Sequence, residues 1–291
     1  MAHKNMKKIA KTLAYWLLPS ALNEVIRGYD YRSVLSYVRN RQVFTANRVF
    51  RDRHRGQRCF ILCNGPSVNL QDLKPLRNEI VFSVSNGYHH KDYQLIGPKY
   101  HCVPQITYGV MTTDDVVAWF KEMDEKVGNA ELFLSNTELE VVSRHQLFRD
   151  RNVSYLCMAR KFGTGETGVV DISRPVPTVS SVSIMCLMIA MYMGFKTIYL
   201  LGTEHDSFVR GEYKYFYEPT VLRGKDMFVS SDGKLTNPIF DELQANLALW
   251  AQYRALKHIA ENHGISVYNA TQGGILDEFE RVTLSKILQS P

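Results

Sequence analysis

Short apolar runs alternate with longer, mostly amphipathic segments from residue 59 onward. The short runs, of which "CFILC" (59–63) and "TIYLLG" (197–202) are clear cases, are typical of strands that are buried on both faces. The predicted strands cover 59–63, 79–86, 100–104, 130–136, 153–158, 197–202 and 265–271, the last of these being the final strand of the sheet.

The longer segments predict helices over 113–127, 180–195 and 238–262. Strands and helices alternate, which favours a mostly parallel sheet with helices on both faces, a Rossmann-like α/β fold. Residues 5–50 also have a helical pattern, with breaks near Pro19 and Gly28. We therefore expect a basic helical extension over 1–57 and a Rossmann-like domain over 58–291.

The positive charge is concentrated at the N-terminus. The net charge is +6, but residues 1–58 contribute +10 and residues 59–291 contribute −4. Four lysines precede "TLAYWLLPSAL", whose apolar run is too short to span a bilayer. This segment suits an anionic membrane surface, and the alternative is a helix packed on the body of the protein. No nucleic-acid-binding motif accompanies the arginines, so nucleic acid is not expected as a partner.

The five cysteines are scattered and show no paired metal-ligand spacing. Scattered cysteines in apolar surroundings are typical of reduced, buried thiols in a cytoplasmic protein. We expect a cytoplasmic location, with peripheral attachment to the inner face of the membrane if the N-terminus binds lipid.

Polar, small and glycine-rich segments follow five of the predicted strands. In a parallel sheet the carboxyl ends of the strands lie at one edge, where ligands bind. The recurrence of such segments predicts one shared nucleotide pocket at that edge. The segments are Asn64-Gly65-Pro66-Ser67, Ser85-Asn86-Gly87, Pro104-Gln105, Gly202-Thr203-Glu204-His205-Asp206 and Asn269-Ala270-Thr271-Gln272-Gly273-Gly274.

The turn from Asn64 to Ser67 could offer backbone amides and the Ser67 hydroxyl to a phosphate. It is neither a Walker loop nor a GxGxxG fingerprint, and an ordinary capped turn uses the same residues. Asn86 could bind a base or a ribose through its amide, or serve as a turn residue. Hydroxyls at Thr178, Ser180 and Ser181 stand near a helix start, where they suit an anion and equally suit N-capping.

The segment "GTEHDSFVRGEYKYFY" is the richest in chemical groups. Its residues Glu204, His205 and Asp206 follow a buried strand, and His205 or an adjacent carboxylate could act as a general base toward a hydroxyl. Arg210 and the tyrosines 213, 215 and 217 could bind a phosphate on a leaving group. Glu204 and Asp206 could also hold a divalent metal, but no repeated Asp-x-Asp element supports this, so no metal or other cofactor is expected.

Four stretches resemble known families: "ILCNGPSV", "SNGYHHKDY", "SSVSIMCLMIAMYMGFKTIYLLGTEHD" and "YNATQGGILDEF". They are similar to the bacterial sialyltransferases of glycosyltransferase family 42. They also resemble the group that contains the motility-associated-factor glycosyltransferases and the archaeal hydroxymethylpterin pyrophosphokinases. The sialyltransferase resemblance implies a single-site, GT-A-like variant of the Rossmann fold that binds a CMP-linked sugar acid.

By position, the resemblance implies that Asn64, Gly65 and Ser67 meet the donor phosphate and ribose. It further implies that Asn86 contacts the nucleotide or sugar and that the serine pair binds the sugar carboxylate. Asp206 takes the place of the first of two tyrosines that contact the leaving phosphate, and Tyr213 falls near the second. The expected donor site consists of Asn64, Gly65, Pro66, Ser67, Asn86, Gln105, Thr178, Ser180, Ser181, Gly202, Thr203 and Tyr213.

Two positions differ from the sialyltransferase pattern. Val179 stands where those enzymes carry an arginine before the Ser/Thr pair, and residues 206–257 lack the histidine of their lid. The expected base is therefore His205 or Asp206, with Glu204 beside them. The implied activity is transfer of the sugar acid to a hydroxyl of a cell-surface glycan or glycolipid, as in lipopolysaccharide or capsule biosynthesis.

Two other functions remain open. One is a hydroxymethylpterin pyrophosphokinase-like diphosphotransferase that uses ATP and magnesium, with Glu204 and Asp206 as metal ligands. The other is a non-catalytic, nucleotide-binding component of a glycan assembly complex.

Overall fold

The computed structural model describes residues 41–106, 111–162, 167–217 and 234–289. Its main strands are β1 (Arg58–Leu62), β2 (Val81–Val84), β3 (Tyr100–Val103), β4 (Glu131–Ser135), β5 (Val153–Leu156), β8 (Thr197–Leu201), β9 (Ser266–Asn269) and β10 (Glu280–Arg281). Two further short strands, β6 (Met158–Arg160) and β7 (Val176–Pro177), pair with each other.

The described helices are α3 (Gln42–Thr45), α4 (Tyr93–Ile96), α5 (Thr113–Lys126), α6 (Leu139–His145), α7 (Val182–Tyr192), α8 (Ser207–Arg210), α9 (Ile239–Asn262) and α10 (Leu284–Gln289). Short 3-10 helices are η1 (Ala46–Phe50), η2 (Pro66–Leu70), η3 (Lys74–Asn78), η4 (Gly87–His89) and η5 (Asn136–Glu138). Only α3 and η1 represent the expected N-terminal helical extension, because residues 1–40 lie outside the described residues.

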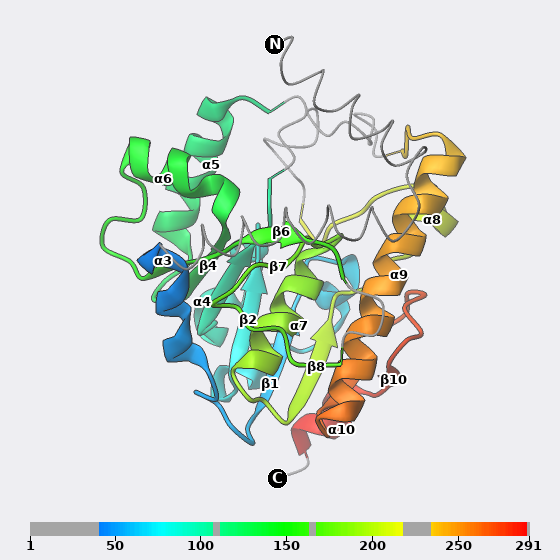
Figure 1. The fold of residues 1–291 in the computed structure, drawn as a ribbon. Helices are drawn as coiled ribbons and strands as arrows, with labels where there is room; N and C mark the ends of the chain where they lie inside the picture. Colours follow the sequence, from blue (N-terminus) through cyan, green and yellow to red (C-terminus); the bar gives the residue numbers. More distant parts are fainter. Residues whose placement is uncertain (1–40, 107–110, 163–166, 218–233, 290–291) are drawn as a thin grey trace, which may run out of the picture.

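Within the described residues, the main strands form one eight-stranded sheet in the order β10-β9-β8-β1-β2-β3-β4-β5 (Figure 1). Each of its described neighbouring pairs is parallel; for example, Phe60 of β1 lies opposite Val81 of β2 and Tyr199 of β8. Helices flank this sheet. The predicted α/β architecture with a Rossmann-like parallel sheet is therefore confirmed.

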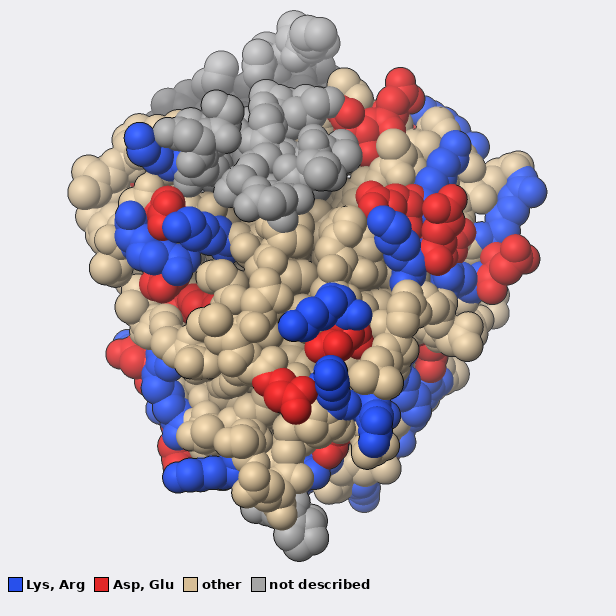
Figure 2. Space-filling model, turned by 180° about the vertical axis from the view of Figure 1, so that it is seen from behind, with Lys and Arg blue, Asp and Glu red and all other residues tan. Residues whose placement is uncertain are grey.

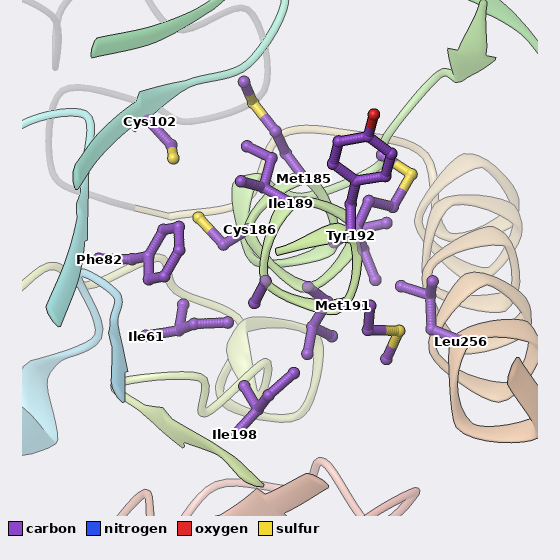
Figure 3. Close-up of a cluster of buried hydrophobic side chains, with 14 of the residues drawn as sticks. Ile61, Phe82, Cys102, Met185, Cys186, Ile189, Met191, Tyr192, Ile198 and Leu256 are labelled. Atoms are coloured by element: carbon purple, nitrogen blue, oxygen red, sulfur yellow. The ribbon is translucent and has the colours of Figure 1, made fainter. Parts of the chain in front are cut away.

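Burial on both faces explains why the strands are continuously apolar. In β1 and just after it, Cys59, Ile61 and Cys63 face one core cluster, whereas Phe60 and Leu62 face another. The first cluster contains α7, which packs between the sheet and α9 (Figure 3). Ten of the 11 residues of α7 are buried, which requires the nearly uniform apolar sequence of this helix.

All five cysteines are buried free thiols, as predicted. None of the helices in the described ranges combines the length and apolar character needed to cross a membrane. On the face shown in Figure 2, Lys and Arg side chains alternate with Asp and Glu, so positive charge does not gather there into a continuous stripe.

Two sequence-based predictions about the strands are wrong. The segment 265–271 does not hold the final strand, because the two-residue β10 pairs with β9 at the sheet edge. A strand of two exposed residues has no apolar run that could reveal it. The predicted strand over 153–158 is divided, since β5 ends at Leu156 and Met158 begins β6 in the second sheet.

The chain changes direction across the sheet at β1. From β1 it runs outward through β2, β3, β4 and β5, and it then returns through α7 to β8 on the opposite side of β1. The connections that leave β1 and β8 therefore diverge, which creates a crevice at the carboxyl ends of these two strands. Such a switch point is the expected ligand site of an open α/β sheet.

Candidate functional site

A cavity of about 660 Å³ opens at this switch point. The loops after β1, β2, β3 and β8, the start of α7 and one side of α9 line it. Most of the predicted site residues meet here: Asn64, Gly65, Pro66, Asn86, Ser180, Ser181, Gly202, Thr203, Glu204, His205, Asp206 and Tyr213. The predicted convergence of the strand ends is thus present in the structure.

Three predicted site residues do not line the cavity. Ser67 is buried behind the β1 loop. Gln105 donates a hydrogen bond from Nε2 to the carbonyl of Val179, and Thr178 is exposed at the surface. The loop after β9 also lies behind the cavity wall, where Thr271 contacts Thr203 through their hydroxyls at 2.9 Å. This loop supports the site without lining it.

Glycines allow the β1 and β8 loops to touch. The Gly65 N–H donates to the Gly202 carbonyl at 3.0 Å. A Cβ on Gly65 would lie 1.6 Å from Glu204 Oε2 and 2.6 Å from the Gly202 oxygen. Gly202 has a φ of +67°, and a Cβ there would lie 2.7 Å from the Cys63 oxygen. In the described structure, the lack of a side chain at both glycines therefore allows the two loops to lie in direct contact.

The Glu204 carboxylate already accepts a hydrogen bond from the backbone N–H of Ser67. This N–H belongs to the turn that was expected to bind a phosphate. Glu204 Oε1 accepts the hydrogen bond from the Ser67 N–H at 2.7 Å. Its Oε2 is buried and has no hydrogen-bond partner among the described residues. An incoming phosphate would have to displace this internal anion, because two negative groups cannot share one donor without repulsion. The β1 loop in this conformation is therefore not an open phosphate cradle.

The two asparagines of the site present opposite hydrogen-bonding groups. Asn86 Oδ1 accepts from Trp119 Nε1 at 2.5 Å and from the Tyr88 hydroxyl at 3.2 Å, so its amide NH₂ is the group that donates, and the Tyr217 hydroxyl is a partner that a ligand would have to share or replace. Asn64 donates from Nδ2 to the Val84 carbonyl at 3.3 Å. Its buried Oδ1 has no hydrogen-bond partner within the described ranges.

His205 lies at the end of the β8 loop in a left-handed backbone conformation, with a φ of 48°. Its Nε2 is 2.7 Å from the hydroxyl of Tyr253, which α9 holds fully buried beneath the cavity. Burial lowers the pKa of His205 to about 4, so the imidazole is neutral at pH 7. A neutral imidazole can accept a proton, although a base with this pKa is weaker than one with a pKa near 7.

Asp206 and Arg210 form an ion pair at 2.9 Å between Oδ1 and Nη2. Because this carboxylate already has a cationic partner, it is less available than His205 as a base. The Lys214 ammonium is similarly paired with Glu212 at 2.6 Å. The cations on this side of the cavity could turn to an anionic ligand only by exchanging these partners.

Three tyrosine rings lie in contact along the cavity wall, of which Tyr215 and Tyr217 are stacked and Tyr213 is tilted. The rings of Tyr213 and Tyr215 have centroids 4.9 Å apart, and those of Tyr215 and Tyr217 are 5.1 Å apart and nearly parallel. The alternation of side chains in an extended segment places all three on one side. The Phe216 N–H donates to the Asn64 carbonyl at 3.0 Å, which fixes this segment beside the β1 loop.

The end of β2 contributes a second unusual backbone conformation. Ser85 lines the cavity with a φ of 44°. The buried His101 donates from Nε2 to the Ser85 carbonyl at 2.9 Å, and its Nδ1 lies 2.7 Å from the Ser83 hydroxyl. Left-handed non-glycine residues are uncommon and are often found at functional sites. Both Ser85 and His205 belong to this class and line the same cavity.

Hydroxyl groups continue inward from the start of α7. Ser181 is the N-cap of α7, and its Oγ accepts from the Ser183 N–H at 3.4 Å. The two hydroxyls lie 2.8 Å apart, and Ser183 Oγ is 2.5 Å from the Tyr253 hydroxyl. The N-terminus of α7 therefore carries hydroxyls beside the positive end of its dipole, which suits an anionic group.

No cluster of three or more metal-ligating side chains occurs among the described residues. The pair considered as metal ligands is already engaged: Glu204 accepts from the Ser67 amide, and Asp206 pairs with Arg210. A divalent cation at this place would have to replace both interactions.

Several cavity residues were missed by sequence reasoning. Ser85 was predicted only as part of the segment Ser85-Asn86-Gly87 and was not singled out as a donor-site residue. Trp119 and Asn246 lie in the predicted helices 113–127 and 238–262, and the sequence does not reveal which turn of a helix reaches the strand ends. Tyr253 lies at an apolar position of α9 and looks like a core residue. Further lining residues that sequence reasoning did not single out include Ser183, Ser207, Glu242 and Leu249.

A comparison of the chain with protein-family models found no match, and a comparison with curated proteins found none.

Proposed function

We propose that this protein is a glycosyltransferase that moves a sugar acid from a CMP-linked donor to a hydroxyl of a cell-surface glycan. The observation that carries the proposal is the cavity at the β1/β8 switch point, where polar loops from four strands meet. Its volume of about 660 Å³ lies within the range of small-molecule and cofactor sites. The resemblance to the sialyltransferases of glycosyltransferase family 42 supplies the reaction class.

The cavity offers complementary groups for each part of such a donor. The NH₂ group of Asn86 and the unpartnered Oδ1 of Asn64 suit the acceptors and donors of a nucleoside. The hydroxyls of Ser180 and Ser181 at the start of α7 suit an anionic group. The tyrosines 213, 215 and 217 provide flat faces and phenolic groups beside it.

In the proposed reaction, an acceptor hydroxyl attacks the anomeric carbon of the donor. The new bond joins the acceptor oxygen to that carbon, and the bond from the carbon to the phosphate oxygen breaks as CMP leaves. His205 takes the proton of the acceptor hydroxyl, because it is neutral and lies in the cavity. Groups that donate hydrogen bonds to the departing phosphate lower the barrier further.

The carboxylates available in the cavity favour a reaction that does not use a metal ion. In a magnesium-dependent diphosphotransferase, Glu204 and Asp206 would be ligands, but these carboxylates are engaged by the Ser67 amide and by Arg210. The proposed acceptor is a glycan or glycolipid. The basic segment before residue 58 is proposed to hold the enzyme at an anionic membrane surface, and most of that segment lies outside the described residues.

Nucleotide binding tests the proposal. We expect CMP to raise the melting temperature of the protein, with no requirement for magnesium, and UDP, GDP and ATP to leave it unchanged. A ligand at 100 times its Kd stabilises the folded state by about 2.7 kcal/mol, which is readily measured. Stabilisation only by ATP with magnesium would contradict the proposal in favour of a kinase. Binding of CMP without turnover of CMP-sugars would instead indicate a non-catalytic nucleotide-binding protein.

The variant Asn86→Asp tests whether CMP binds in this cavity. Its carboxylate still accepts from Trp119 but replaces the NH₂ donor by an acceptor with negative charge. We expect the Kd for CMP, measured by calorimetry, to rise at least about tenfold, as for the loss of one hydrogen bond to a charged or polar group. The control Asn262→Asp changes an exposed asparagine at the far end of α9 and should keep the wild-type Kd. Equal affinities in both variants would place CMP elsewhere.

A further inference from the structure

A continuous row of hydrogen-bonding groups runs beneath the cavity from one wall to the other. It begins at His205 Nε2, passes through the hydroxyl of Tyr253 at 2.7 Å, and reaches Ser183 Oγ at 2.5 Å. It ends at Ser181 Oγ, a further 2.8 Å away. His205, Ser183 and Ser181 all line the cavity, whereas Tyr253 is fully buried. The row therefore connects two places on the cavity surface through the protein interior.

The chemistry of these groups allows the row to run in either direction. Each hydroxyl has one proton to donate and lone pairs to accept another, and a neutral imidazole donates from one nitrogen and accepts at the other. In one direction, His205 Nε2–H donates to Tyr253, Tyr253 to Ser183, and Ser183 to Ser181. In the other, every donor becomes an acceptor and His205 carries its proton on Nδ1. Moving one proton along each link, together with the gain of a proton at His205 Nδ1 and the loss of one from Ser181 Oγ, converts the first arrangement into the second.

The surroundings favour a neutral row. Burial raises the pKa of Tyr253 well above its usual value, so the phenol keeps its proton. The charged side chains that line the same cavity are Glu204, Asp206, Arg210, Lys214 and Glu242. The hydrogen bonds that form the row do not involve these side chains, and in the described structure Asp206 pairs with Arg210 and Lys214 with Glu212.

We propose that Tyr253 and Ser183 form a proton relay that joins the base His205 to Ser181, and that Ser181 faces the departing phosphate of the donor instead of the sugar carboxylate that the resemblance implies there. The proposal rests on the proposed glycosyl transfer. When the acceptor hydroxyl loses its proton to His205 Nδ1, the Nε2 proton passes to Tyr253. Tyr253 then passes its own proton to Ser183, and Ser183 to Ser181. Ser181 delivers one to the departing phosphate, so that no net charge stays on the buried residues.

The relay assigns different roles to its members. Tyr253 is a positioning residue because it sets which nitrogen of His205 carries the proton. Ser183 links Tyr253 to Ser181, and its hydroxyl is hydrogen-bonded to these two residues and not to His205. The relay thus explains why the fully buried phenol of Tyr253 lies between the cavity-lining residues His205 and Ser183.

Three variants test the relay. Tyr253→Phe removes the central hydroxyl, and Ser183→Ala breaks the row while leaving Tyr253 beside His205. Tyr192→Phe is the control, since it removes a buried tyrosine hydroxyl from the far end of α7. We expect kcat for sugar transfer to fall at least about tenfold in the first two variants with little change in KM, and to stay at the wild-type value in the control.

Rescue separates a relay from a structural effect. In Ser183→Ala, imidazole added to the buffer should restore at least half of the lost kcat, because a small proton carrier can replace the broken link. A purely structural defect would not respond to the buffer. Wild-type kcat in Ser183→Ala, or a loss that imidazole does not restore, would overturn the relay.

A second readout does not depend on turnover. Nitrogen chemical shifts of His205 report which ring nitrogen carries the proton. We expect Ser183→Ala to move these shifts toward the Nδ1–H form, because Tyr253 is left with His205 as its acceptor, and Tyr192→Phe to leave them unchanged. Identical shifts in wild type and Ser183→Ala would overturn the relay even if the protein transfers no sugar. Moved shifts without any transferase activity would instead contradict the proposed function alone.

Discussion

Two histidines, the fully buried His101 and the partly buried His205, should make the stability of the folded state depend on pH. Burial lowers the pKa of His101 to about 3 and that of His205 to about 4, below the usual value of 6.5. Between pH 6.5 and pH 4 the unfolded chain therefore binds protons that the folded chain does not. The free energy of unfolding consequently falls as the pH is lowered through this window.

The variant His101→Gln tests this dependence. Its free energy of unfolding should change less between pH 6.5 and pH 4 than that of the wild type, by an amount on the order of 3 kcal/mol, since one pKa unit corresponds to about 1.4 kcal/mol. Urea unfolding at several pH values measures the slope. The exposed His258→Gln serves as the control and should keep the wild-type slope. A wild-type slope in His101→Gln would show that His101 is not held neutral.

Individual site residues were predicted with mixed success. The sequence correctly placed Asn64, Asn86, His205 and others at strand ends, because the alternation of apolar and polar segments marks where each strand stops. It did not predict that Glu204 binds the Ser67 amide, since these residues are 137 positions apart. The link from His205 to Tyr253 was equally invisible, because a tyrosine in an apolar helix face is usually a core residue.

At the scale of elements, contact between the β1 and β8 loops requires Gly65. Its backbone φ of −67° is open to any residue, so a substitution there meets a limit of space and not of backbone conformation. A Cβ would lie within 2.6 Å of both Glu204 Oε2 and the Gly202 oxygen, and the latter belongs to the backbone. We expect Gly65→Ala to lower the free energy of unfolding by about 1–3 kcal/mol, the usual cost of overpacking.

The matched control is Gly168→Ala, because a Cβ on Gly168 would have no neighbouring atom within 4 Å among the residues that the structure describes. Urea unfolding should show no loss of stability in this variant. A stability of Gly65→Ala equal to that of the control would mean that the two loops separate easily, which would contradict the close contact described above.

The elements themselves were predictable to different degrees. The strands buried on both faces and the helices α5, α7 and α9 stood out because their apolar patterns are long or continuous. The turns η2 and η3 after β1 and the edge strand β10 did not, because each is short and is held by contacts with neighbours. The two-stranded β6/β7 sheet also escaped prediction, since its strands are too short to show a period.

At the scale of the whole molecule, the location of the cavity depends on the order of the strands in the sheet more than on the number of strands. The sequence predicted a parallel sheet. Only the structure shows that the strands after β1 are added on one side of it as far as β5, and that β8 and the later strands lie on its other side. This arrangement decides which loops form the cavity and leaves the β9 loop behind it. Chain order alone does not specify which neighbour each strand takes, so the sequence predicted the edge of the sheet at which the site lies but not which of the strand-end loops line it.

The central claim is that the loops after β1, β2 and β8 form one site for a CMP-linked donor. A crystal structure of the protein soaked with CMP tests it most directly. We predict electron density for the nucleotide in the cavity between Asn64 and His205, with Asn86 within hydrogen-bonding distance of it. Density for CMP outside this cavity, or an empty cavity at a CMP concentration that saturates the protein in solution, would contradict the claim.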